Sequence, residues 1–151
     1  MKQATLDRDT LLAKARAAAE HAYAPYSHFR VGAAVVVETP QGPRVVTGAN
    51  IENASYGLTL CAERSALAAA CMLEGAAPAE GEDNRRQPRV MAVAVACVDA
   101  PPDTLASQRS PCGACRQWLA ELAPDAVYFV DGIPGELRLP DLLPYAFRLP
   151  E

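Results

Sequence analysis

Residues 61–74 read CAERSALAAACMLE, and Gly75 follows them. The alanines and leucines of this stretch favour an α-helix, and a glycine directly after the last turn is a common helix C-terminus. Apolar residues cover nearly the whole circumference of the predicted helix, and a helix that is apolar on all sides is buried on all sides. In a chain of 151 residues a sheet covers only one side of such a helix. We therefore expect a partner subunit to cover the rest, which predicts an oligomer.

The segments around this helix predict an α/β fold. Residues 90–98 are apolar without alternation, which is typical of a central strand covered on both faces. Two β-branched runs flank TPQGP at 39–43, which favours a hairpin turn. The order of elements predicts one domain over residues 1–151, a three-layer α/β/α domain with a mixed, roughly five-stranded sheet. Its predicted helices are 6–23, 61–74 and 111–122, its strands are 31–38, 44–51, 90–98, 126–130 and a short 137–139, and 79–88 is a polar surface loop.

Charge and composition limit the possible partners. The net charge is −4, the pI is near 5.2, and Lys and Arg form no run. A nucleic-acid-binding surface needs a basic stripe that neutralises phosphates, so we expect no nucleic acid partner. The N-terminus lacks the apolar core of a signal peptide, and no apolar stretch approaches the roughly 20 residues of a membrane span. We expect a soluble, cytoplasmic protein with no membrane partner.

Three cysteines in two short segments predict a metal site. Cys61 begins the central helix, and Cys112 and Cys115 form a Cys-x-x-Cys hook. Three protein ligands leave one position of a tetrahedral zinc ion open, as catalytic zinc sites require, whereas a fourth ligand closes a structural site. Cys71 and Cys97 lie in apolar stretches and are expected to be small buried hydrophobes. His21 and His28 are isolated in the sequence, and neither is assigned to the metal.

Glu63 is predicted to carry protons instead of binding the metal. Zinc lowers the pKa of a water at its open position toward about 7, and a nearby carboxylate can accept the proton. Cys61 and Glu63 can face one pocket only if Cys61 lies at the very start of its helix, because helical positions two apart point to opposite sides. Arg64, or alternatively Arg116, is expected to hydrogen-bond the thiolate sulfurs and to offset their negative charge.

Five motifs in one order resemble those of the small homotetrameric cytidine deaminases. They are APYSHFRVGA at 24–33, NIENASY at 50–56, CAER at 61–64, SPCGACRQ at 110–117 and LLPYAF at 142–147. The resemblance runs from about residue 6 to residue 147. Residues 79–88 and 101–109 are longer than is usual in that family, and the second segment directly precedes the cysteine hook.

The resemblance implies zinc-dependent hydrolytic deamination of cytidine and 2′-deoxycytidine to uridine and 2′-deoxyuridine, with release of ammonia, in pyrimidine salvage. It also implies one zinc ion per subunit on Cys61, Cys112 and Cys115, with Glu63 moving protons at C4 of the pyrimidine. The family is homotetrameric and shares its active sites between subunits. The matching nucleoside-binding positions are Phe29, Asn50 and Glu52 and, from a neighbouring subunit, Ala54, Tyr56 and Phe147.

Three alternatives remain open from the sequence. A related aminohydrolase such as blasticidin S deaminase is similar in fold and motifs. A non-catalytic zinc module can use the same cysteines for stability alone. Polynucleotide editing is disfavoured by the acidic charge balance.

Overall fold

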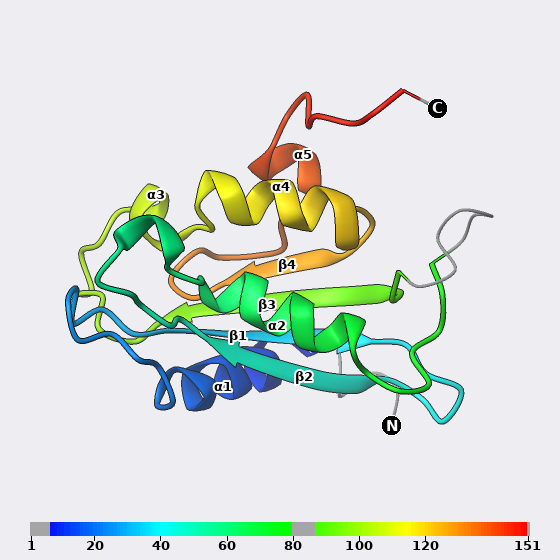
Figure 1. The fold of residues 1–151 in the computed structure, drawn as a ribbon, viewed down its shortest axis with the longest axis horizontal. Coiled ribbons are helices and arrows are strands. Elements are labelled where there is room, and N and C mark those ends of the chain that lie inside the picture. Colours follow the sequence, from blue (N-terminus) through cyan, green and yellow to red (C-terminus); the bar gives the residue numbers. More distant parts are fainter. Residues whose placement is uncertain (1–6, 80–86, 151) are drawn as a thin grey trace.

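The computed structural model describes residues 7–79 and 87–150. Its centre is a mixed sheet of four strands in the order β2-β1-β3-β4 (Figure 1). β1 pairs antiparallel with both β2 and β3, while β3 pairs parallel with β4. The strands are β1 (Val31–Val37), β2 (Arg44–Ala49), β3 (Val90–Cys97) and β4 (Val127–Val130), and the helices are α1 (Arg8–Ala19), α2 (Ala62–Cys71), α3 (Ala106–Arg109), α4 (Gly113–Leu122) and α5 (Leu139–Leu142).

Helices cover both faces of this sheet, which confirms the predicted three-layer α/β/α architecture (Figure 1). Successive side chains of a strand point to opposite faces. Val36 of β1 therefore packs with Leu11 and Leu12 of α1, whereas Val35 belongs to the core under α2 and α4. Both leucines are fully buried, and each such side chain contributes about 1.5–3 kcal/mol through apolar burial.

Two glycines let helices approach the hairpin closely. A Cβ at Gly32 would lie 1.8 Å from the backbone oxygen of Ala15 in α1. A Cβ at Gly48 would lie 2.4 Å from the backbone nitrogen of Ala66 in α2. No side chain fits in either gap, so these positions bring α1 and α2 directly onto the sheet. Gly48 thereby fixes where the first turns of α2 lie.

The expected hairpin is confirmed, and its register pairs Val37 with Arg44. In its turn, Gly42 has a φ of 110° and its N–H donates to the Thr39 carbonyl at 2.9 Å. The strand expected at 137–139 is reduced to one bridge between Tyr128 and Leu137, because Leu139 already begins α5. The sheet of the described chain therefore has four strands where roughly five were expected.

The helices α3 and α5, which have four residues each, were not predicted from the sequence. Such short helices have too few turns to show a hydrophobic period. The two ends of the predicted loop at 79–88 meet through a hydrogen bond from the Ala79 N–H to the Gln87 carbonyl at 2.9 Å. Residues 80–86 of this loop lie outside the described residues. Within the described residues, no helix is both long and apolar enough for a membrane span.

The helix α2 is buried on one side only within this chain. Ala66, Leu67 and Ala70 are fully buried, whereas Met72 just beyond its end is 81% exposed. The prediction for Cys71 is wrong, because this thiol lies on the outward side of the last turn and is exposed. Cys97 at the end of β3 is buried, as expected.

Candidate metal centre and active site

The fold brings the three predicted thiols together. Cys61 immediately precedes α2, Cys112 immediately precedes α4, and Cys115 lies in the first turn of α4. Their sulfurs all lie within 4.8 Å of one another, and the Sγ atoms of Cys61 and Cys112 are 3.8 Å apart. Zn–S bonds of about 2.3 Å at tetrahedral angles place two sulfurs about 3.8 Å apart. Three free thiols at this spacing fit a zinc ion, which thiolate ligands favour over hard cations.

Both candidate metal-binding segments lie at helix N-termini. Cys61 has φ −70° and ψ 156°, and Cys112 has φ −67° and ψ 168°, so both residues are extended and lie just outside their helices. The positive end of the helix dipole stabilises a thiolate at such a position. Because Cys61 lies at the very start of α2, the geometric condition for Cys61 and Glu63 to face one pocket is met.

Glu63 lies beside the sulfurs in a nearly closed environment. Its side chain is 4% exposed, and its Oε2 accepts a hydrogen bond from the Cys115 thiol at 3.6 Å. Burial, reinforced by the neighbouring Cys61 sulfur, raises the pKa of the Glu63 carboxyl above its ordinary value. Such a carboxyl binds a proton more readily than a solvated one, as a proton carrier must.

Arg64 supplies positive charge to the cluster. Its guanidinium donates to the Thr59 carbonyl at 2.9 Å and to the Cys61 Sγ at 3.6 Å. The neighbouring Cys115 sulfur, together with the Arg64 guanidinium, lowers the pKa of Cys61 to about 5. The neighbouring Cys61 sulfur and burial raise the pKa of Cys115.

Arg116 contacts backbone and hydroxyl oxygens instead of sulfur. Its guanidinium donates to the Pro111 carbonyl at 2.8 Å, to the Ser110 Oγ at 2.9 Å and to the Leu142 carbonyl at 2.5 Å. Arg116 thus holds the segment before Cys112 against α5. Of the two arginines considered from the sequence, Arg64 is the one that contacts a sulfur.

The residues predicted to bind ribose hold the loop that precedes β1. The Asn50 side chain accepts from the Val31 N–H at 2.8 Å and donates to the Phe29 carbonyl at 2.9 Å. Glu52 accepts from the N–H groups of Tyr26 at 2.9 Å and Ser27 at 3.2 Å. Hydrogen bonds from Ser27 and its neighbour lower the pKa of Glu52, so this carboxylate stays charged.

Three of the six predicted substrate-binding residues, Phe29, Glu52 and Tyr56, line two hollows. Glu52 and Tyr56 share a hollow of about 200 Å³ with Tyr26, Ser27 and Thr59. The rings of Tyr26 and Tyr56 stand 5.9 Å apart. Sequence reasoning assigned no role to these three additional residues, although Tyr26 and Ser27 lie in a quoted motif and Thr59 lies two residues before Cys61.

The other hollow, of about 400 Å³, has Phe29 on one side and residues of the 101–108 segment on the other. Ala54 and Phe147 line neither hollow and are exposed. Phe147 is 67% exposed, and its carbonyl accepts from the Gln117 side chain at 3.1 Å. Within a single chain, both residues are therefore open to solvent.

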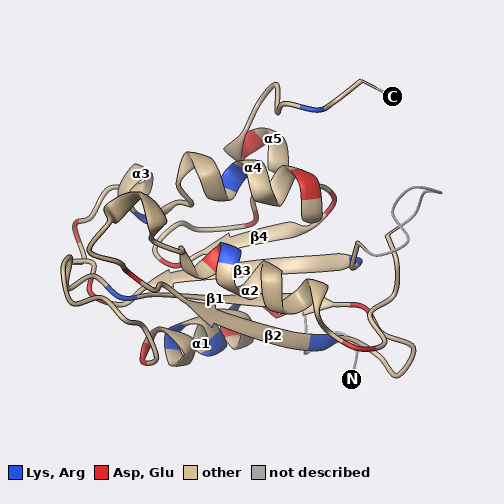
Figure 2. Cartoon of the chain, in the orientation of Figure 1, with Lys and Arg blue, Asp and Glu red and all other residues tan. Residues whose placement is uncertain are grey.

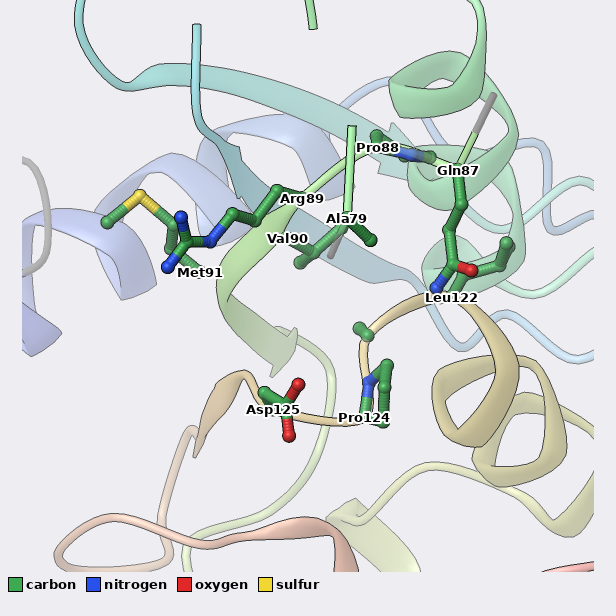
Figure 3. Close-up of a pocket in the computed structure, with 10 residues that line it drawn as sticks. Ala79, Gln87, Pro88, Arg89, Val90, Met91, Leu122, Pro124 and Asp125 are labelled. Carbon is green, nitrogen blue, oxygen red and sulfur yellow. The ribbon is translucent and has the colours of Figure 1, made fainter. Parts of the chain in front are cut away.

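A larger hollow of about 480 Å³ lies at the opposite end of the sheet, where β3 begins and α4 ends (Figure 3). Its charged lining residues are Arg89 and Asp125. Arg89 pairs with Glu38 at 2.9 Å. No thiol or imidazole is among its described lining residues, so its size does not make it the reaction site.

Known proteins of one family match this chain. The model of the cytidine and deoxycytidylate deaminase zinc-binding region matches residues 6–131. A cytidine deaminase of Halalkalibacterium halodurans is 42% identical over 146 residues, 94% of this chain and 95% of that protein. A cytidine deaminase of Mycobacterium tuberculosis is 42% identical over 144 residues, 95% of this chain and 92% of that protein.

Solved structures agree with this match. A crystal structure of cytidine deaminase from Mycobacterium tuberculosis superposes with a TM-score of 0.71 at 40% identity, covering 95% of this chain and 98% of that one. That of the Burkholderia pseudomallei cytidine deaminase gives a TM-score of 0.72 at 40% identity, covering 93% and 99%. With three zinc-compatible thiols and an adjacent buried glutamate in place, the chain belongs to the cytidine and deoxycytidylate deaminase family.

Proposed function

We propose that this protein is a zinc-dependent cytidine deaminase that converts cytidine and 2′-deoxycytidine to uridine and 2′-deoxyuridine. The reaction consumes one water and releases one ammonia. The single observation that carries this proposal is the convergence of the Cys61, Cys112 and Cys115 sulfurs beside the buried carboxyl of Glu63. Relatives of similar length that carry the name cytidine deaminase support the substrate class.

The proposed mechanism divides the work between the metal and the protein. Zinc, held by the three cysteines, would supply a nucleophile at neutral pH by lowering the pKa of a coordinated water. Glu63 would accept the proton of that water and deliver it to N3 of the pyrimidine ring. It would then take the second proton of the water from the oxygen that has bonded to C4 and deliver it to the amino group, so that the C4–N bond breaks and ammonia leaves. Such proton transfer contributes typically about 10² to 10⁴ in rate.

Arg64 would balance the charge of the site. Three thiolates and Zn²⁺ carry a formal net charge of −1, which weakens the metal as a Lewis acid. The Arg64 guanidinium lies 3.6 Å from the Cys61 Sγ, and its Nε is buried without a hydrogen-bond partner among the described residues. This positive charge offsets the excess and keeps the site able to polarise its substrate.

Nucleoside binding is proposed for the residues around the loop before β1. Phe29 would pack against the nucleoside, and Asn50 and Glu52 would hydrogen-bond the ribose. Each amide or carboxylate retains capacity for this, because the bonds to Val31, Phe29, Tyr26 and Ser27 do not use all of its donor and acceptor sites.

A homotetramer with shared active sites is part of the proposal. Ala54, Tyr56 and Phe147 are exposed in the single chain and would complete the pocket of a neighbouring subunit. The exposed side of α2 near Met72 would be covered in the same assembly. Pyrimidine salvage in the cytoplasm is the setting that follows from a free nucleoside substrate and zinc thiolates.

Metal analysis combined with a cytidine absorbance assay tests this function. Purified protein should hold one zinc per chain and turn over cytidine, and Glu63→Gln should retain its zinc and fold while kcat falls by at least about 10². A structural zinc module would show zinc and no turnover in either protein. That outcome would overturn the proposal.

Substrate panels separate the remaining alternatives. Turnover of blasticidin S without turnover of cytidine would favour the related aminohydrolase. Polynucleotide editing would require deamination of cytosine in a single-stranded oligonucleotide. Figure 2 shows Lys and Arg scattered among acidic residues on the described chain instead of gathered in a stripe, so we expect none.

A further inference from the structure

Arg109, at the end of α3, is a buried cation that the proposed mechanism does not use. Its side chain is 9% exposed. The guanidinium donates to the Pro101 carbonyl at 2.6 Å and to the Thr104 carbonyl at 3.3 Å. It thus ties Pro101 and Thr104, in the first half of the 101–108 segment, to the end of α3.

Gly132 closes the other side of the Arg109 side chain. It has a φ of 83°, and a Cβ there would lie 3.0 Å from the Cδ, Nε and Cζ atoms of Arg109. Asp131, the preceding residue, forms a two-pronged ion pair with Arg16 at 2.7 and 2.8 Å. Arg109 therefore anchors the 101–108 segment to the turn that follows β4.

Burying this guanidinium carries a cost in free energy, which the fold recovers only through well-formed contacts. The carbonyls of Pro101 and Thr104 provide two such contacts. The hydrogen bonds from Arg16 lower the pKa of Asp131, with a smaller contribution from the positive charge of Arg109, so this carboxylate is charged and favours the cation. An apolar side chain would fill the same space at lower cost, so the contacts made by Arg109 indicate a role in fixing the segment.

The 101–108 segment faces Phe29 across the hollow of about 400 Å³, where it presents Asp103, Thr104 and Gln108. The Phe29 side of this hollow is held separately. Arg30 donates its backbone N–H and its guanidinium to Asp99 at 2.8–2.9 Å. The Phe29 side of the hollow thus depends on Asp99, and the 101–108 side depends on Arg109.

We propose that Arg109 is a positioning residue, which holds the 101–108 segment at the distance from Phe29 that the nucleoside needs. This inference rests on the proposed function, because Phe29 is taken as a nucleoside contact. It concerns binding and not the chemical step, since Cys112 and Pro111 are held independently through α4 and Arg116.

Arg109→Met tests the inference, with Arg109→Lys as the conservative variant and Arg16→Met as the matched control. Arg16→Met removes two hydrogen bonds at the same turn after β4 without touching the 101–108 segment. Binding must then order a segment that Arg109 no longer fixes, so the KM of Arg109→Met for cytidine should rise about 10-fold, equivalent to about 1.4 kcal/mol. We expect kcat within about twofold of wild type and unchanged zinc content, because chemistry and metal ligands are untouched. Lys, which can reach one carbonyl, should give an intermediate KM.

Hydrogen exchange gives a second readout that does not depend on turnover. Amides of residues 101–108 should exchange faster in Arg109→Met than in wild type or Arg16→Met. An unchanged KM in folded, zinc-loaded Arg109→Met would overturn the inference. It would also be overturned if Arg109→Met and Arg16→Met showed the same rise in KM, the same fall in kcat and the same loss of zinc. If Arg109→Met does not fold, an unchanged KM in Arg109→Lys decides against it. Absence of cytidine turnover by wild type would instead refute the proposed function, with exchange at 101–108 still reporting on Arg109.

Discussion

At the scale of single residues, the neighbours Glu63 and Arg64 differ in environment more than their sequence positions suggest. Glu63 is enclosed beside the Cys115 sulfur, whereas Arg64 runs along the Cys61 sulfur to the Thr59 carbonyl. Consecutive side chains on a helix point in directions about 100° apart, so one can face the reaction site while the other supports it. Proton transfer and charge balance thereby come from one helix turn.

Removing the charge of Arg64 should weaken zinc binding. Arg64→Gln removes the cation that contacts the Cys61 sulfur, so zinc affinity should fall about 10-fold to 100-fold, as is usual when partners of metal ligands are lost. Chelator competition measures the change. Arg89→Gln is the control, since Arg89 pairs with Glu38 at the other end of the sheet. Equal zinc affinity of wild type and Arg64→Gln would contradict the role given to Arg64.

At the scale of elements, the position of α2 on the hairpin decides where the metal ligands lie. The Gly48 backbone of β2 passes directly beneath Ala62, Ser65 and Ala66, with no space for a side chain. Cys61 and Glu63 belong to the same turn. The placement of the site therefore depends on a close contact between a strand and a helix, in addition to the ligands themselves.

Gly48→Ala should move that helix. Its methyl group would lie 2.4 Å from the Ala66 nitrogen, so the free energy of unfolding should fall by about 1–3 kcal/mol, as overpacking usually causes, and kcat should fall with it. Gly57→Ala is a control for stability, because a Cβ there meets nothing within 4 Å. Denaturant unfolding and turnover measure both effects. Equal unfolding midpoints for the two variants would show that α2 does not depend on this contact.

The loop before β1 should show a pH-dependent contribution to stability through Asp99. Hydrogen bonds from the Arg30 side chain and backbone lower the pKa of Asp99 to about 2, from about 3.9 in the unfolded chain. A lowered pKa means that the contribution is fully present above pH about 4 and is lost as the pH falls toward about 2.

Asp99→Asn should therefore melt below wild type at neutral pH, and the gap should close over this acidic range. Melting temperatures across a pH series measure it. A gap that stays constant down to the lowest pH would mean that the charge of Asp99 is not the cause.

At the scale of the whole molecule, one chain leaves large apolar side chains exposed on the C-terminal segment and beside α2. Tyr145 and Phe147 protrude from the segment after α5, and Met72 is 81% exposed. Burying such surface favours association. The same surface includes residues proposed to complete a neighbouring pocket, so assembly and activity should depend on each other.

Met72→Glu should disrupt that assembly. Wild type should have a mass near four times 16.0 kDa in solution, while the variant should form smaller species with lower activity, because a charge would be buried between subunits. Light scattering coupled to size exclusion, followed by turnover, measures both. Ala17→Glu on the exposed side of α1 is the control. A fully active wild-type monomer would contradict shared active sites.

The amino-acid sequence by itself determined the α/β class, the hairpin, the three thiols and the glutamate. These features are local, because turn residues, apolar runs and helix-start cysteines act within a few neighbours. The tertiary structure decided which arginine reaches sulfur, why Asn50 bonds to Val31 and Phe29, and how Arg109 holds the 101–108 segment. It also decided that Cys71 is exposed. Such outcomes depend on how elements distant in the chain pack against one another, and no local pattern records that geometry.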